Sequence, residues 1–71
     1  MSGIVEEREV PFRLALECIG GSRHGRTLML QRGKTETRAL SLPKDGEPQH
    51  IERYEKVLVP AAGRAFLVYR P

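Results

Sequence analysis

A glycine-rich segment is the first feature of the sequence whose residue types and spacing could do chemistry. Residues 20–27 read Gly-Gly-Ser-Arg-His-Gly-Arg-Thr, which fits a phosphate-binding loop except that Arg26 stands where that motif has lysine. In such a loop the next residues open a helix, whose N–H groups meet the phosphates. Here residues 28–30 are Leu-Met-Leu and continue as a strand. We therefore interpret the segment as a glycine-rich turn between two strands and not as a nucleotide site.

Metal-binding and nucleophilic sites are the other chemistry that the sequence could hold. A metal ion would have to gather Cys18, His24 and His50, but their separations do not match those of paired ligands. Cys18 is the only cysteine and alternates with the apolar side chains before it, so we expect a buried, unreactive thiol. The only aspartate, Asp45, lies in a loop and offers no Ser-His-Asp arrangement. We expect no enzymatic activity, no catalytic residue, no metal ion and no cofactor.

A cluster of basic side chains is the candidate contact surface. It consists of Arg23, His24, Arg26, Arg32, Lys34 and Arg38, with Glu36 as the only acidic residue among them. Arginine pairs well with the carboxylates of a protein and with the phosphates of a nucleic acid. Because the cluster has no aromatic side chain on which bases could stack, we favour a protein partner. Weak, nonspecific binding of nucleic acid and a merely solvated face are the alternatives.

Short strands have to position these residues. Apolar side chains alternate with polar ones over residues 12–18, which predicts a half-buried strand, and residues 27–31 read as its hairpin partner. The turn between them contains Gly20, Gly21 and Gly25. We assign these glycines a structural role and expect at least one to adopt a positive φ, which only glycine does without strain.

The second half of the chain alternates less clearly. Residues 35–42 form a weak strand signal, and residues 43–48, Pro-Lys-Asp-Gly-Glu-Pro, are the strongest loop signal in the chain. Residues 54–59 and 65–69 read as a C-terminal hairpin around a Pro-Ala-Ala-Gly turn. The apolar spacing within residues 51–58 also fits a helix, and this alternative stays open.

Length and composition allow one small domain. The 71 residues carry a net charge of +3, with an acidic arm over residues 1–9 and a β core over residues 10–71. The expected fold is all-β, with four to five short antiparallel strands in a meander, a curled sheet or a small barrel and at most one helical turn. No stretch is apolar for long enough to span a bilayer, so we expect no membrane contact. The predicted core consists of Phe12, Leu14, Leu16, Leu28, Leu30, Val57, Val59 and Phe66.

Two parts of the chain resemble short proteins of bacteriophages and prophages, most of which have no assigned activity. Residues 16–28, Leu-Glu-Cys-Ile-Gly-Gly-Ser-Arg-His-Gly-Arg-Thr-Leu, resemble their pattern of a strand, Gly-Gly-Pro-x-Asp-Gly and a second strand. Ser22 and His24 stand where that pattern has Pro and Asp. Residues 52–55 and 63–69 resemble their Tyr-containing strand, Gly-bearing turn and last strand ending near Tyr. The resemblance implies a small β fold with no catalytic residues.

The resemblance also implies a viral accessory or structural protein. We expect a non-enzymatic module that acts by protein–protein contact, most concretely as a small virion component such as a capsid decoration or tail-associated protein. Its partners would be copies of itself or other virion proteins. The alternative is an early phage accessory protein that binds a host factor, a nucleotide or nucleic acid through the basic loops. The expected location is the virion or the host cytoplasm.

Overall fold

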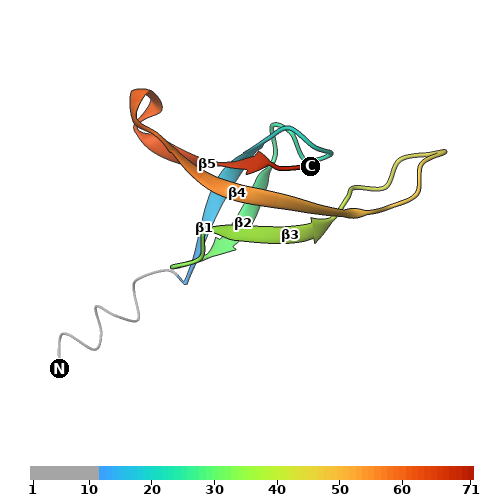
Figure 1. Ribbon diagram of the computed structural model, residues 1–71, viewed down its shortest axis with the longest axis horizontal. Helices are drawn as coiled ribbons and strands as arrows, with labels where there is room; N and C mark the ends of the chain where they lie inside the picture. The colour runs from blue at the N-terminus through green and yellow to red at the C-terminus, as the bar shows by residue number, and fades with distance from the viewer. Residues whose placement is uncertain (1–11) are drawn as a thin grey trace.

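Five strands form one curled sheet in a computed structural model that describes residues 12–71 (Figure 1). The elements are β1 (Arg13–Ile19), β2 (Thr27–Gln31), β3 (Glu36–Leu40), β4 (Ile51–Val59), the short 3-10 turn η1 (Pro60–Ala62) and β5 (Arg64–Tyr69). The strand order is β2-β1-β5-β4-β3, and the sheet curls into a nearly closed barrel. The predicted all-β fold is therefore confirmed, whereas the predicted acidic arm over residues 1–9 lies outside the described residues.

Both predicted hairpins are present. β1 pairs antiparallel with β2, and β4 pairs antiparallel with β5 from Tyr54↔Tyr69 to Val59↔Arg64. The helical alternative for residues 51–58 is wrong, because β4 lies between β3 and β5 and pairs with both. The apolar spacing of residues 51–58 fits both a helix and a strand, and hydrogen bonding to a strand on each side favours the strand. Within residues 12–71, no helix is long and apolar enough to cross a membrane.

One strand pairing was not expected from the sequence. β1 and β5 run parallel, with Cys18 opposite Leu67 and Ile19 opposite Val68, so the sheet is mixed and not wholly antiparallel. The first and last strands of the chain are thus direct neighbours inside the sheet and point the same way (Figure 1). A parallel pair needs a long connection, which here is the whole of β2, β3 and β4.

The core lies on the concave face of the sheet. Its buried apolar side chains are Cys18, Leu30, Tyr54 and Leu67, and Leu16, Leu28 and Tyr69 pack against them. The prediction is thus confirmed for Leu16, Leu28 and Leu30. Leu14 is half-buried on the same face of β1, but it lies beyond this cluster.

Four predicted core residues lie elsewhere. Phe12 precedes β1 and is 78% exposed. Val57, Val59 and Phe66 are only half-buried, and alternation places them on the face opposite Tyr54 and Leu67. The prediction was wrong because apolar residues occupy both faces of β4 and β5 near their shared turn, so the sequence pattern does not mark the inner face there.

Candidate functional site

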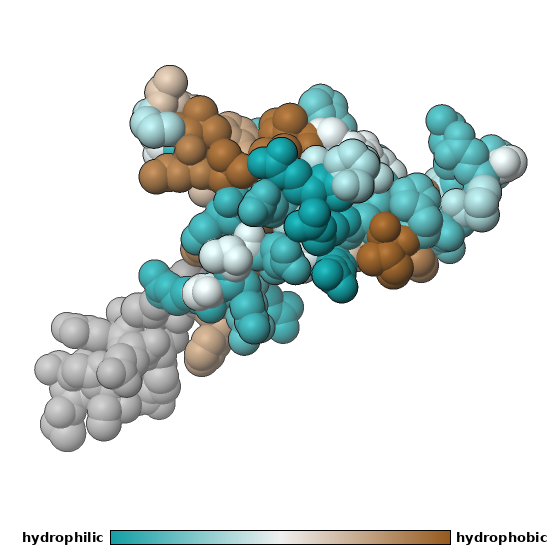
Figure 2. Space-filling view, in the orientation of Figure 1, coloured by the Kyte–Doolittle hydropathy of each residue, from teal (hydrophilic) through white to brown (hydrophobic). Residues whose placement is uncertain are grey.

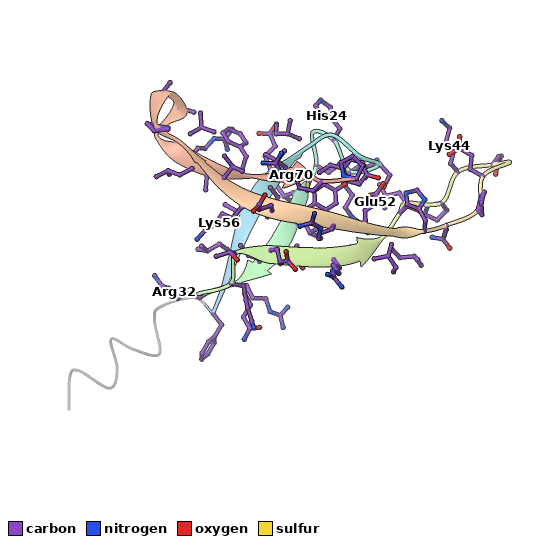
Figure 3. All side chains as sticks on the ribbon, in the orientation of Figure 1. His24, Arg32, Lys44, Glu52, Lys56 and Arg70 are labelled. Atoms are coloured by element: carbon purple, nitrogen blue, oxygen red, sulfur yellow. The ribbon has the colours of Figure 1, made fainter. Side chains whose placement is uncertain are left out.

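A buried carboxylate is the most site-like feature of the fold. Glu52, on β4, is 2% exposed and is the only buried charged residue among residues 12–71 (Figure 3). The Ser22 N–H donates to its Oε2 at 3.0 Å, and the hydroxyls of Ser22 and Tyr54 donate to its Oε1 at 2.8 and 2.9 Å. His50 Nε2 lies 3.4 Å from Oε2. These four residues, the Glu52 network, join the β1–β2 loop to β4.

The local sequence explains how these groups meet. Two residues separate Glu52 from Tyr54 along β4, so alternation places both side chains on the concave face. Ser22 follows two glycines in the loop, and its hydroxyl also accepts the N–H of Leu42 at 2.9 Å. In the described part of the chain, no buried side-chain nitrogen or oxygen lacks a hydrogen-bond partner. The buried charge is therefore held by dedicated donors, as burial of a charge requires.

Glycine is required where the loop meets two tyrosine rings. Gly20, Gly21 and Gly25 all have positive φ, at 86°, 71° and 83°, which confirms the predicted turn. A Cβ atom on Gly21 would lie 2.4 Å from Tyr54 Oη and 3.2 Å from Tyr69 Cδ1. No atom lies within 4 Å of a Cβ placed on Gly25. Gly21 is thus needed for both its backbone conformation and its close approach to tyrosine, and Gly25 for its conformation alone.

The Tyr54 hydroxyl links the loop to the carboxylate. It donates to Glu52 and lies 3.3 Å from the Gly20 carbonyl oxygen, while the Arg23 N–H donates to it at 3.4 Å. The ring packs at 5.7 Å from that of Tyr69, with the two planes inclined at 50°. These contacts hold the loop through its backbone, so the loop's shape depends little on its exposed side chains.

The surroundings shift the pKa values of Glu52, Tyr54 and Cys18. Burial by itself raises the pKa of Glu52, but the Ser22 and Tyr54 donors and the charge of His50 outweigh it and bring that pKa below the ordinary 4.5. Burial, and then the hydrogen bond to Glu52, raise the pKa of Tyr54 to about 12. Burial also raises the pKa of the Cys18 thiol, against the opposing charge of Arg23. At neutral pH the network therefore holds an ionised Glu52 and a neutral Tyr54.

The Glu52 network has the residue types of a catalytic triad but not its connectivity. In a triad, histidine lies between the serine and the carboxylate and takes the serine proton. Here the Ser22 hydroxyl donates directly to Glu52, and His50 contacts the other carboxylate oxygen. The Cys18 thiol is fully buried, as the sequence predicted. Residues 12–71 enclose no pocket and contain no group of three side chains suited to a metal ion. This arrangement can fix a loop, and nothing in it activates a nucleophile.

The six basic residues predicted as a contact surface do not lie together. Arg23, His24 and Arg26 lie in the β1–β2 loop, Arg32 and Lys34 lie at the other end of β2, and Arg38 lies on β3. Figure 3 shows His24 and Arg32 far apart on the fold. Residues that are close in sequence are separated here by the length of a strand.

Several of these side chains contact groups of the fold itself. The Arg23 guanidinium donates to the Leu40 carbonyl oxygen, and His24 Nδ1 accepts the Gly20 N–H at 2.8 Å. Arg38 lies 3.8 Å from Glu36. The side chains of Arg26 and Lys34 are exposed. Their role in contacting a partner stays a prediction.

Sequence reasoning missed the Glu52 network, although the signal was present. Glu52 occupies a position of β4 that shares a face with Tyr54, and a charge at such a core position indicates a hydrogen-bonding or charged partner.

No protein-family model, curated protein or solved structure matches the chain.

Proposed function

We propose that this protein is a non-enzymatic β module that acts by protein–protein contact. The observation that carries the proposal is an apolar projection, the hairpin arm, formed by residues 57–66 at the turn between β4 and β5 (Figure 1). Its residues are Val57, Leu58, Val59, Pro60, Ala61, Ala62, Gly63, Arg64, Ala65 and Phe66. Figure 2 shows the arm as a brown surface at one end of the molecule. Exposed apolar patches of this kind mark interaction sites.

The strand pairing explains why the arm projects. β3 pairs with β4 only between Ile51 and Glu55, and β1 pairs with β5 only at Leu67 and Val68. Beyond these limits the hairpin has two strands, and an isolated two-stranded hairpin is marginally stable in water. A partner that adds a strand or covers the apolar side chains would stabilise it.

A second exposed apolar group supports the same proposal. Leu40 and Ile51 lie directly opposite each other on β3 and β4, and Ile51 is 64% exposed. The arginines Arg38 and Arg53 form the next pair on the same face of these strands, two positions along. Arginine beside apolar side chains is typical of protein interfaces.

The virion assignment is the finer part of the proposal and rests on the resemblance to short phage proteins. We expect the chain in purified particles of the phage that encodes it, at a fixed number of copies per particle. Quantitative mass spectrometry of particles, with a major capsid protein as internal reference, measures this. If the chain occurs only in the cytoplasm of infected cells, the assignment is wrong and an early accessory role replaces it.

Binding of nucleic acid tests the alternative function. Because the basic side chains are dispersed and several contact the fold itself, we expect weak binding without sequence preference that is lost between about 50 and 200 mM salt. Titration of labelled duplex and single strands measures it. Tight binding that survives the upper salt concentration, and that is lost on Arg26→Glu with Lys34→Glu, would contradict the protein-contact proposal.

A further inference from the structure

The outer edge of β3 is open along its first half. The odd-numbered residues of β3 direct their backbone groups toward β4. The Thr35 carbonyl accepts the Lys56 N–H at 2.8 Å, and the Ser41 N–H donates to the His50 carbonyl at 2.7 Å. The even-numbered residues of β3 therefore face away from β4. β3 is the last strand of the sheet order, so the described chain places no strand on that side.

The β1–β2 loop occupies only the far end of this edge. The Arg23 guanidinium donates to the Leu40 carbonyl oxygen, and the Leu42 N–H donates to Ser22 Oγ at 2.9 Å. Both Leu40 and Leu42 are even-numbered, which confirms the direction of the edge. The open part of the edge consists of the N–H and C=O groups of Glu36 and Arg38.

The described chain begins beside this open part of the edge. The Phe12 carbonyl accepts the Arg32 N–H, which continues the β1–β2 ladder one position beyond its last pair. Arg32 lies at the end of β2, shortly before β3 begins. If the ladder keeps its register past that point, Arg8 lies opposite Glu36. The residues before Phe12 can therefore reach the edge of β3 without a connecting loop.

Residues 4–10 carry the side chains that suit this edge. They read Ile-Val-Glu-Glu-Arg-Glu-Val, and Arg8 is their only basic residue, so only Arg8 can oppose Glu36 with the opposite charge. An antiparallel strand with that pair has Glu6 opposite Arg38, whereas a parallel strand has a valine there. The antiparallel register is thus the only one that gives both charged residues of the edge an oppositely charged partner.

The ladder and the charges select the same register. The charges require Arg8 opposite Glu36, and continuation of the β1–β2 ladder gives that pair without any shift. Even-numbered residues exchange the hydrogen bonds in this ladder, as the Cys18 N–H shows by donating to the Arg26 carbonyl at 2.7 Å. Even-numbered residues of β3 also carry the open backbone groups. Charge, register and hydrogen-bonding direction therefore agree.

We propose that residues 4–10 form a sixth strand on the outer edge of β3 in the same molecule, antiparallel to β3 and continuous with β1. Glu6 exchanges backbone hydrogen bonds with Arg38, and Arg8 with Glu36, as directly opposed residues of this type do. The extended first strand then pairs with β3 at one end and with β2 at the other, so it closes the barrel. This inference does not depend on the proposed function.

The corner between β2 and β3 is compatible with this path. The φ of Gly33 is 88°, and the Lys34 N–H donates to the Gln31 carbonyl at 3.0 Å. Across this corner the more buried face changes from the even-numbered residues of β2, such as Leu30, to the odd-numbered residues of β3. In the proposed register Pro11 lies opposite Gly33. Its missing N–H is not needed, because odd-numbered residues direct their backbone groups away from β3.

Both faces of the new strand find apolar neighbours. Directly opposed residues share a face, so Ile4 lies beside Leu40, which is itself opposite Ile51 on the outer face. Leu40 is 47% exposed and gains a neighbour on its open side. On the inner face Val5 lies opposite Ala39, which is half-buried. The sixth strand thus adds one apolar cross-strand pair to each face.

A pair of cysteines tests the register directly. Val5 and Ala39 form a non-hydrogen-bonded pair, whose Cα atoms lie about 4.5 Å apart, within the range that a disulfide bridges. The control is Val5→Cys with Thr35→Cys, which are four positions out of register, about 13 Å along the strand. With oxidised glutathione, we expect Val5→Cys with Ala39→Cys to form an intramolecular disulfide roughly tenfold faster than the control. The native Cys18 is buried and does not react. Equal rates, or a disulfide-linked dimer in place of the intramolecular bridge, would overturn the proposal.

Exchange of the Glu36 and Arg38 amide hydrogens tests the pairing in the unmodified chain. We expect both amides to be protected to an extent that does not depend on protein concentration. Amides that exchange as those of an unpaired edge do would overturn the proposal. Protection that rises with concentration would also overturn it, because the strand would then come from another copy.

Reversal of one charge pair identifies the side chains involved. We expect Glu6→Arg to lower the protection of the Arg38 amide by about threefold or more, and Glu6→Arg with Arg38→Glu to restore it. Glu7→Arg is the matched control, because it changes the charge equally but lies opposite the uncharged Thr37. Equal effects of Glu6→Arg and Glu7→Arg would overturn the register. None of these variants alters the hairpin arm, so this inference and the proposed function fail separately.

Discussion

Replacing Gly21 by alanine is expected to lower the free energy of unfolding by about 4 kcal/mol, most of the margin of a domain of this size. Two effects add. A positive φ of 71° strains any residue with a side chain, and the new Cβ would lie 2.4 Å from Tyr54 Oη. Relief of that clash requires the loop or the tyrosine to move, which also disturbs the donors on Glu52. Urea unfolding followed by circular dichroism measures the loss.

Two further variants separate these effects. Gly25→Ala has a φ of 83° but open space around the new methyl group, so we expect a loss of only about 1–2 kcal/mol. In a Tyr54→Phe background the nearest atom is absent, and Gly21→Ala should then lose less than in the wild-type chain. Equal losses at Gly21 and Gly25 would show that the approach to Tyr54 is unimportant.

Glu52→Gln is expected to lower the free energy of unfolding by about 3 kcal/mol near neutral pH. Both carboxylate oxygens face donors: Ser22 and Tyr54 hydroxyls at Oε1, and the Ser22 N–H and His50 at Oε2. An amide offers one oxygen and one NH₂ group, so its oxygen can accept the Ser22 N–H only if the NH₂ group faces the hydroxyls of Ser22 and Tyr54, which must then turn to accept. The hydrogen bonds to a charged oxygen are lost in either orientation. Glu55→Gln is the matched control, because Glu55 is a partly exposed carboxylate of the same strand, paired with Arg70. We expect it to lose less than about 1 kcal/mol.

The contribution of Glu52 should also depend on pH. Its pKa is lower in the folded state than the ordinary 4.5, so the folded protein favours the ionised form. The stabilisation is therefore complete above about pH 4.5 and disappears as the pH falls through the lower folded pKa. Urea unfolding at about pH 7 and about pH 3 measures this. The difference between wild type and Glu52→Gln should narrow on acidification, and an unchanged difference would contradict this role of the carboxylate.

The alternation of apolar side chains predicted which residues form strands but not which face of every strand is buried. In β1 the two faces differ in polarity, and burial of Leu16 and Cys18 followed from the pattern. Near the β4–β5 turn both faces are apolar, so Val57 and Phe66 were placed in the core although Tyr54 and Leu67 occupy it. A pattern of period two carries information about burial only when one face is polar.

Contacts between residues far apart in sequence could not be predicted from local patterns. The parallel pairing of β1 with β5 and the hydrogen bonds from Ser22 to Glu52 each join distant segments. Glutamate is seldom fully buried, so its residue type argued for a surface position. The basic residues show that neighbours in sequence can also lie far apart. Arg26 and Arg32 are near neighbours in sequence, but β2 runs between them, so they lie at opposite ends of that strand.

The parallel pairing of the first and last strands has a consequence for the order of folding. β5 supplies Leu67 to the core and is hydrogen-bonded to β1 on one side and β4 on the other. During synthesis the chain can form the β1–β2 and β3–β4 hairpins early, but within residues 12–71 nothing joins these two halves of the sheet until β5 has been made. Non-local pairing of this kind slows folding and leaves apolar edges exposed meanwhile. The nascent chain therefore passes through a period in which Leu16, Leu28 and Leu30 are made but uncovered.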